Sequence, residues 1–330
     1  MLVRILIAAT LMFSSFAHAD AAWESYKSRF LQPDGRIVDT GNGGVSHTEG
    51  QGFAMVMAVE NNDRQSFDKL WQWTDKTLRN KQNGLFYWRY TPGAANPVAD
   101  RNNATDGDTM IAWALLRAGQ RWQEPAYGKA SDAITRSLLK HAVITFAGYR
   151  LMLPGAQGFN LGDKVNLNPS YFIFPAWQAF YQRSHLVAWR DLGSDAKKLL
   201  PKMDWGSSHL PSDWVTLSAD GKLAPAQGWP PRMSYDAVRI PMYIYWQDPK
   251  SPLLTPWRNW WQGFSRSKTP AWVNVYTSDM SPYSMNEGLL AVRDLTLGSN
   301  VENPYITAKD DYYSASLKIL ASLAQKMAPQ

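Results

Sequence analysis

Cysteine is absent from this chain of 330 residues, and its absence excludes several kinds of chemistry at once. A chain without cysteine forms no disulfide, has no thiol nucleophile and offers no thiolate to a metal ion. Histidine is also scarce, with five residues, and none of them forms an HxH or HExxH pattern. The sequence therefore predicts neither a metal site nor a cofactor.

Charge is sparse as well. Asp, Glu, Lys and Arg make up 19% of the residues, and no run of Lys or Arg is longer than two. The formal net charge of +6 is scattered, so it does not indicate nucleic-acid binding. The sequence also lacks a GxSxG elbow and a phosphate-binding glycine loop, which leaves a serine hydrolase or a nucleotide enzyme without support.

Long apolar runs are confined to the first residues. Arg4 precedes an apolar stretch over 5–16, and an A-x-A cleavage pattern ends at Ala19. This stretch is short for a membrane span, and polar sequence follows it. We predict a signal peptide over 1–19 and a single catalytic domain over 20–330, with no membrane span in the mature chain. The mature protein is then exported to the periplasm or out of the cell.

Two kinds of helix pattern alternate along the chain, which is rich in aromatic residues. One kind is apolar on nearly all sides and so predicts buried helices. The other kind keeps one apolar face at the spacing of a half-buried helix. The all-apolar segments are 52–59, 110–118, 171–181, 237–246 and, more weakly, 285–297. The amphipathic segments are 67–78, 186–200, 253–264 and 313–324.

An inner ring of helices wrapped by an outer ring explains this alternation. About eleven helices are expected, the first near 23–30, with short strands in the loops near 81–100 and 205–230. A plain helical bundle is the alternative, but its helices would be mostly amphipathic rather than split into two classes.

Three acidic residues occupy equivalent places, because Glu49, Asp106 and Asp236 each open a predicted inner helix. If the inner helices run parallel, these carboxyl groups meet at one rim of the ring. Capping is the competing interpretation. Ser46 with Glu49 and Thr105 with Asp108 fit capping boxes, and Ser234 fits an N-cap before Asp236.

Glycines and aromatic residues beside these acids favour a sugar-binding site. Glycine admits a ligand close to the backbone, and aromatic faces suit the apolar faces of pyranose rings. Hydrolysis of a glycosidic bond needs one protonated carboxylic acid and one carboxylate. A helix N-terminus favours the charged form of Glu49, so burial and a neighbouring Asp would have to outweigh the helix dipole.

Four motifs surround the three acids and the predicted aromatic contacts. They are TEGQGFAM at 48–55, ATDGDTMIAWALLRAGQRW at 104–122, NPSY at 168–171 and SYDAVR at 234–239. Together they resemble the motifs of glycoside hydrolase family 8. Two more, LMLPG at 151–155 and SDWV at 212–215, resemble the branch encoded with bacterial cellulose synthases. This resemblance implies an all-α (α/α)6 barrel with minor β structure in loops. It also implies a secreted endo-β-1,4-glucanase that cleaves with inversion.

The resemblance also implies roles for individual residues. Glu49 would be the general acid, Asp236 the general base, and Asp106 would hold and distort the sugar ring. Arg239 would orient Asp236 and keep it ionised, although an ordinary helix ion pair is equally compatible with the sequence. The implied sugar contacts are Trp88, Tyr171 and Tyr235, for which core packing is the alternative.

Some assignments stay open at this point. The implied partners are β-1,4-glucan chains and the cellulose synthesis and export machinery. Related chitosanase, xylanase or lichenase activity is an alternative, as is a non-catalytic glucan-binding component of a secretion complex. His47 lies two residues before Glu49 and fits a solvated loop histidine better than a tuning residue. The region 265–283 matches no family pattern, so no site residue is assigned there.

Overall fold

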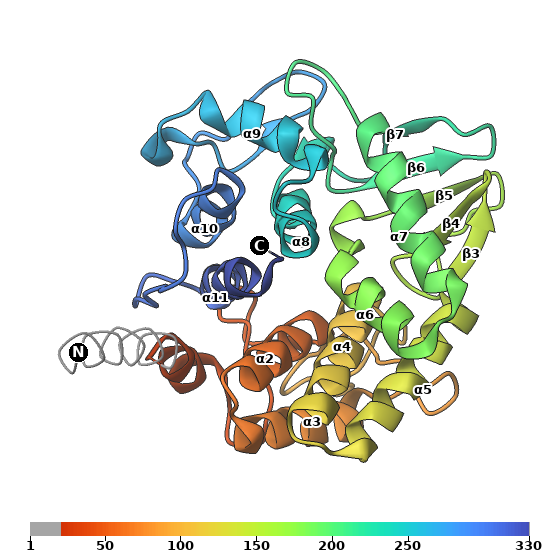
Figure 1. Cartoon of the computed structure of the whole chain (residues 1–330), viewed down its shortest axis with the longest axis vertical. Helices are drawn as coiled ribbons and strands as arrows, with labels where there is room; N and C mark the ends of the chain where they lie inside the picture. Colours follow the sequence, from red (N-terminus) through yellow and green to blue (C-terminus); the bar gives the residue numbers. More distant parts are fainter. Residues whose placement is uncertain (1–20, 330) are drawn as a thin grey trace, which may run out of the picture.

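The computed structural model describes residues 21–329, so the predicted signal peptide lies outside the described residues. Six helices form a closed inner ring, in which each helix contacts the next and the last returns to the first (Figure 1). None of the described helices is both long and apolar enough to cross a membrane. The inner helices are α2 (Thr48–Glu60), α4 (Thr105–Arg121), α6 (Phe174–Ser184), α8 (Ile240–Gln247), α10 (Glu287–Thr296) and α11 (Tyr312–Met327).

Five amphipathic helices lie outside this ring, and each precedes or follows an inner helix in the chain. Their apolar faces pack on the inner helices, while their other faces are exposed. The arrangement confirms the predicted all-α (α/α)6 barrel. The outer helices are the one over residues 21–30, α3 (Arg64–Leu78), α5 (Pro125–His141), α7 (Val187–Leu199) and α9 (Thr255–Gln262).

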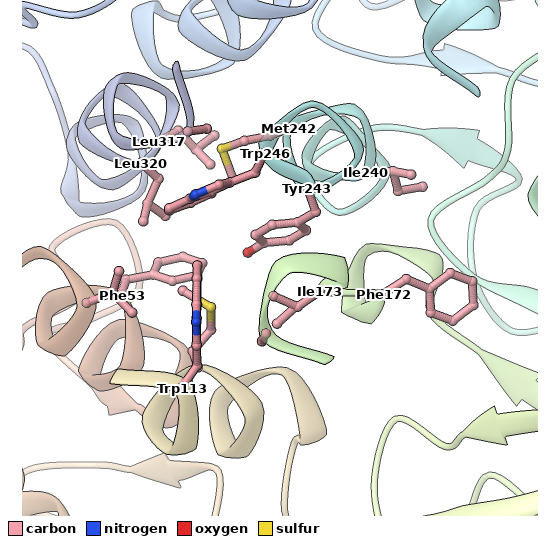
Figure 2. Packing of buried hydrophobic residues seen from close by; sticks show 14 of the residues in the cluster. Phe53, Trp113, Phe172, Ile173, Ile240, Met242, Tyr243, Trp246, Leu317 and Leu320 are labelled. Atoms are coloured by element: carbon pink, nitrogen blue, oxygen red, sulfur yellow. The ribbon is translucent and has the colours of Figure 1, made fainter. Parts of the chain in front are cut away.

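Bulky side chains from the inner helices fill the centre of the barrel. Trp113 and Trp246 meet edge to face, with ring centroids 5.1 Å apart (Figure 2). Helices α2 and α4 approach closely because of glycine: a Cβ on Gly52 would lie 2.6 Å from the Cβ of Met110. This close packing aligns the first turns of the two helices, which carry Glu49 and Asp106.

Helix α11 corrects one prediction. The pattern over 313–324 predicts a half-buried outer helix, but α11 is buried on nearly all sides and contacts both α2 and α8. Its small residues include several serines, which the periodicity counts as a polar face. In the structure Ser316 donates to the carbonyl of Tyr312. A serine satisfied in this way packs like a small apolar residue.

Short antiparallel strands connect the helices. The predicted strands near 81–100 and 205–230 are present as β2, β6 and β7, whereas β3, β4 and β5 fall outside those windows. The pairs are β1 (Ser46–His47) with β2 (Arg89–Tyr90), β3 (Val143–Phe146) with β4 (Tyr149–Met152), and β8 (Arg232–Met233) with β9 (Val273–Asn274). A three-stranded sheet has the order β5 (Lys164–Leu167), β6 (Val215–Ser218), β7 (Leu223–Pro225).

This last sheet positions the site. Leu167 at the end of β5 pairs with Val215 at the start of β6. The residues just beyond that pair, Asn168 on one strand and Trp214 on the other, are therefore brought to the same edge. The 3-10 helices are η1 (Pro169–Tyr171), η2 (Leu200–Lys202), η3 (Ala237–Arg239), η4 (Pro252–Leu254) and η5 (Arg266–Lys268).

Candidate active site

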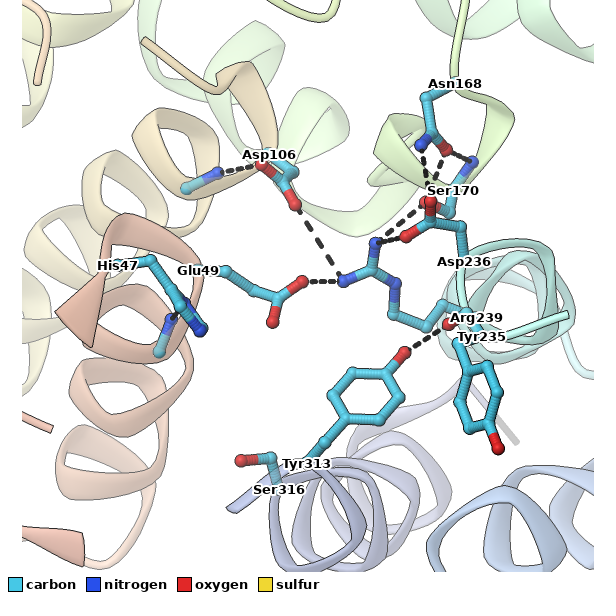
Figure 3. Close-up of polar contacts among 12 residues, drawn as sticks. His47, Glu49, Asp106, Asn168, Ser170, Tyr235, Asp236, Arg239, Tyr313 and Ser316 are labelled. Atoms are coloured by element: carbon cyan, nitrogen blue, oxygen red, sulfur yellow. Dashed lines mark hydrogen bonds and ion pairs between the residues drawn. The ribbon is translucent and has the colours of Figure 1, made fainter. Parts of the chain in front are cut away.

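The three acids meet at one rim of the barrel, as the sequence predicts. Glu49 lies in the first turn of α2, Asp106 in the first turn of α4, and Asp236 immediately before η3 and α8. Figure 3 shows their carboxyl groups converging on the guanidinium of Arg239. Three segments that are far apart in the chain thus bring their acids to one cation.

Arg239 is the centre of this cluster and is only 1% exposed. Its Nη1 donates to Glu49 Oε2 and lies 3.8 Å from Asp106 Oδ2. Its Nη2 donates to Asp236 Oδ1 at 3.0 Å and to Ser170 Oγ at 2.9 Å. The planar fork of the guanidinium therefore fixes Glu49 and Asp236 relative to each other. A simple i,i+3 pair with Asp236 describes only part of its contacts.

Burial shifts Asp106 and Asp236 toward their neutral forms. Burial raises the pKa of Asp106 to about 7, the charge of Glu49 adds to the rise, and Arg239 opposes it. Burial also raises the pKa of Asp236, with Arg239 acting in the opposite direction. Arg239 thus favours ionised Asp236, as predicted, but burial outweighs it. The cluster holds more carboxylates than cationic charge, which favours retention of a proton.

The capping interpretation of these acids is wrong. Helix α2 is capped by His47, whose Nδ1 accepts from the amide of Gly50 at 3.2 Å, while Ser46 lies in β1. Helix α4 has no side-chain cap, and the hydroxyl of Thr105 donates to the carbonyl of Leu153. The carboxylate of Glu49 and the Oδ2 of Asp106 are therefore directed to Arg239 at the rim, while the Oδ1 of Asp106 accepts from the amide of Gly107 at 2.7 Å.

His47 is not the solvated loop histidine that the sequence favours. Its Nε2 bonds Asp39 Oδ2 at 3.1 Å, and its side chain is 12% exposed. Its ring meets the ring of Tyr312 edge to face, with centroids 5.2 Å apart. The hydroxyl of Tyr312 in turn donates to Glu49 Oε1 at 3.2 Å. His47 therefore fixes the first turn that carries Glu49, and Tyr312 binds its carboxylate.

Asp236 is held by residues that sequence reasoning does not assign to the site. Asn168 Nδ2 donates to Asp236 Oδ2 at 3.0 Å, and the Trp214 side chain also donates to this carboxylate. Asp213 accepts from the amides of Ser234 and Ala237, which flank Asp236. Asn168 and Asp213 both lie inside recognised motifs, but only the tertiary contacts show that they support Asp236.

A pocket at the rim contains most of the predicted substrate contacts. It encloses about 170 Å³ and is lined by Glu49, Asp106, Trp88, Tyr171 and neighbouring residues. Trp88 is fixed there by a 2.7 Å bond from its Nε1 to Asp100. The aromatic side chains therefore border the same space as two of the acids.

Tyr235 is placed differently. Its side chain is 40% exposed and does not line that pocket, although its carbonyl accepts from the hydroxyl of Tyr313. Its contact with a sugar stays a prediction. A second aromatic group lies beside Tyr171, where Trp214 stacks between Phe159 and Trp229 with centroid distances of 5.7 and 4.5 Å.

Comparison with known proteins agrees with this architecture. The sequence model of glycosyl hydrolases family 8 matches residues 3–327. The chain is 63% identical to an endoglucanase from Cellulomonas uda over 308 residues, which is 93% of this chain and 86% of that protein.

Two solved structures have closely similar folds. One is a family 8 endo-β-1,4-glucanase from an Achatina fulica gut metagenomic library. It has a TM-score of 0.92 and 69% identity over 93% of this chain and 98% of that one. The other is an endo-β-1,4-glucanase from Acetobacter xylinum, with a TM-score of 0.90 and 38% identity over 95% and 99% of the two chains. The chain therefore belongs to glycosyl hydrolase family 8, as an endoglucanase of that family.

Proposed function

We propose that this endoglucanase cleaves internal β-1,4-glucosidic bonds with inversion, using Glu49 as general acid and Asp236 as general base. The observation that carries the proposal is the shared contact of both side chains with Arg239. Inverting hydrolysis needs two carboxyl groups on opposite sides of the scissile bond, held at a fixed separation that admits a water molecule. A buried guanidinium between the two groups provides such a fixed separation.

The acid has a proton source within the cluster. Glu49, Asp106 and Asp236 together carry more potential negative charge than Arg239 neutralises, and burial penalises that excess. The pKa of Asp106, raised to about 7, fits a cluster that retains a proton in neutral solution. Glu49 delivers this proton to the leaving oxygen, while Tyr312 orients its other carboxyl oxygen.

The base has room for a water molecule. Asp236 accepts from Arg239 on Oδ1 and from Asn168 on Oδ2, and each carboxylate oxygen has two acceptor positions. A water bound at a remaining position is held by a carboxylate whose orientation is already fixed. Asp106 is neither the general acid nor the general base in this proposal: it shares the proton that the cluster retains and binds the sugar ring next to the cleavage point.

The substrate assignment rests on relatives and on the aromatic surface. Solved structures at 69% and 38% identity are described as endo-β-1,4-glucanases. Trp88 and Tyr171 border the pocket that contains Glu49 and Asp106, and aromatic faces suit pyranose rings. Positive net charge disfavours cationic chitosan as the substrate.

The biological setting is part of the proposal. The apolar stretch and the cleavage pattern that ends at Ala19 support export to the periplasm or beyond. The two motifs at 151–155 and 212–215 support a role beside a cellulose synthesis and export machinery. N-terminal sequencing of the exported protein is expected to begin at Asp20; an intact Met1 on exported protein would contradict the signal peptide.

The test of the chemistry combines two measurements on wild type, Glu49→Gln and Asp236→Asn, after thermal melts establish folding. Release of reducing ends is measured on carboxymethyl-cellulose, chitosan and xylan. Wild type is expected to release reducing ends from carboxymethyl-cellulose. Both variants are expected to release them at least about 10²-fold more slowly. Proton NMR of fresh products from a gluco-oligosaccharide is expected to show the α-anomer first. A β-anomer would contradict inversion, and activity on chitosan alone would contradict the substrate.

A further inference from the structure

We infer that Asp213 is a positioning residue for Asp236, which it holds in place by capping the turn on which Asp236 stands. The inference rests on the proposed role of Asp236 as general base. Asp213 lies 23 residues before Asp236, in the bend two residues before β6. Its hydrogen bonds go to Ser234, Ala237 and Arg232 rather than to the carboxylate of Asp236. It acts through the backbone on either side of the base.

The contacts of Asp213 enclose the base. Its Oδ1 accepts from the amide of Ser234 at 2.9 Å and from the amide of Ala237 at 2.8 Å. Its Oδ2 accepts from the hydroxyl of Ser234. Its own amide donates to the carbonyl of Arg232 at 2.7 Å. The chain is thus bound two residues before Asp236 and one residue after it.

These bonds change what Asp236 does at the start of its helix. Asp236 is the N-cap residue of η3, and aspartate at an N-cap normally accepts from the first free amides of its own helix. Asp236 makes no such bond, since the amide of Val238 donates to the carbonyl of Ser234 and the amide of Arg239 to the carbonyl of Asp236. Asp213 accepts from the remaining amide of this turn, that of Ala237. The carboxylate of Asp236 is then available to Arg239 and Asn168.

Burial makes this arrangement sensitive to any change at Asp213. Burial and the neighbouring charge of Asp236 raise the pKa of Asp213 to about 7, while the three donors favour its ionised form. Two carboxyl groups this close repel each other when both are ionised. Hydrogen-bond donors must offset this repulsion, and the bonds from Ser234 and Ala237 to Asp213 do so.

The contrast with Asp63 shows what a purely structural cap looks like. Asp63 caps the outer helix α3 through the amide of Ser66 at 3.0 Å. It also accepts from Trp23 Nε1 at 2.9 Å and from Lys27 Nζ at 2.7 Å. Asp63 therefore has as many donors as Asp213 but lies on an outer helix, away from the acid cluster.

The experiment compares Asp213→Ala, Asp213→Asn and the control Asp63→Ala. Steady-state hydrolysis of a soluble gluco-oligosaccharide gives kcat and KM, calorimetry gives binding of the same sugar in an Asp236→Asn background, and thermal melts give stability. Asp213→Ala is expected to lower kcat roughly 100-fold and leave sugar binding near wild type, because misplacement of a reacting group affects the chemical step. Asp213→Asn keeps an acceptor for both amides and is expected to recover most of kcat. Asp63→Ala is expected to lower the melting temperature without lowering kcat.

The opposite results overturn the inference. They are wild-type kcat in folded Asp213→Ala, an Asn variant as inactive as the Ala variant, or a loss of kcat in Asp63→Ala equal to that in Asp213→Ala. If Asp213→Ala does not fold, Asp213→Glu replaces it, because one extra methylene displaces the same acceptors; wild-type kcat in that variant contradicts the inference. An inactive wild type or an active Asp236→Asn variant would instead refute the proposed function.

Discussion

The two proposed proton-transfer groups are built into the barrel in different ways. Glu49 stands on a regular α-helix whose cap, His47, lies two residues away in the chain. Asp236 stands before a 3-10 turn whose first amide donates to Asp213, from the bend before β6, and its side chain is held by Asn168 from a third segment. The backbone that carries the acid is therefore capped locally, whereas the backbone that carries the base is bound by a distant segment. Both carboxylates are held by tertiary contacts.

The largest expected effect comes from substitution of Arg239, which binds both Glu49 and Asp236. In Arg239→Lys a single point charge replaces the fork that holds Glu49 and Asp236 together. We expect kcat to fall by at least about 10²-fold in a protein that still folds. Arg117→Lys is the matched control, because Arg117 pairs with Glu60 at the other end of α2. Equal activity of the two variants would show that Glu49 and Asp236 do not need to be held by one guanidinium.

Asp106, on the acid side, gives a prediction about pH and stability. Its pKa is raised from 3.8 to about 7 in the folded chain, so folding favours the protonated form. Its contribution to stability is fully present below the unfolded pKa and is lost as the pH rises through the folded pKa. We expect the free energy of unfolding, measured in urea, to fall between about pH 4 and about pH 7, and Asp106→Asn to flatten this dependence. An unchanged slope in the variant would contradict the assignment.

Asn168 tests the base side separately. Its bond to Oδ2 favours ionised Asp236, so its removal raises the pKa of Asp236 further. Since the base acts when ionised, the acidic limb of kcat/KM in Asn168→Ala is expected to move to higher pH, by less than about one unit. Asn166→Ala is the control, since Asn166 bonds Thr216 rather than an acid. A limb that stays in place or moves to lower pH would argue against this contact.

The smallest expected effect separates the true cap of α2 from the one that the sequence suggests. His47→Ala removes the acceptor for the amide of Gly50 and is expected to cost about 1 kcal/mol of stability. Ser46→Ala removes only an acceptor for Arg36, which keeps the carbonyl of Gly44. Urea unfolding is expected to show a smaller loss for Ser46→Ala. A loss of stability in Ser46→Ala equal to or larger than that in His47→Ala would support the capping box of Ser46 and Glu49 instead.

The sequence predicts the barrel and the three acids because both depend on local patterns. All-round apolar segments indicate buried helices, and an acid at the start of each places Glu49, Asp106 and Asp236 at one rim. Helix α11 escapes this reasoning, because hydrogen-bonded serines such as Ser316 imitate a polar face. Periodicity measures polarity and cannot show that a hydroxyl is satisfied within its own helix.

The supporting residues of the site are harder to predict for a different reason. Asn168 reaches Asp236, and Asp213 reaches its neighbours, through bonds between segments far apart in the chain, which no short pattern specifies. The same holds for Tyr312, which reaches Glu49 across 263 residues of chain. Capping boxes at Ser46 and Thr105 are plausible locally and are displaced by His47 and by the carbonyl of Leu153.

Leaving-group dependence tests the division of labour between Glu49 and Asp236 most directly. The measurement compares kcat/KM for a gluco-oligosaccharide and for its dinitrophenyl β-glycoside in wild type, Glu49→Gln and Asp236→Asn. A dinitrophenolate leaves without a proton, so Glu49→Gln is expected to lose at least about 10²-fold on the natural bond and little on the activated one. Asp236→Asn is expected to lose activity on both. Equal losses of Glu49→Gln on the two substrates would contradict the assignment of Glu49 as general acid.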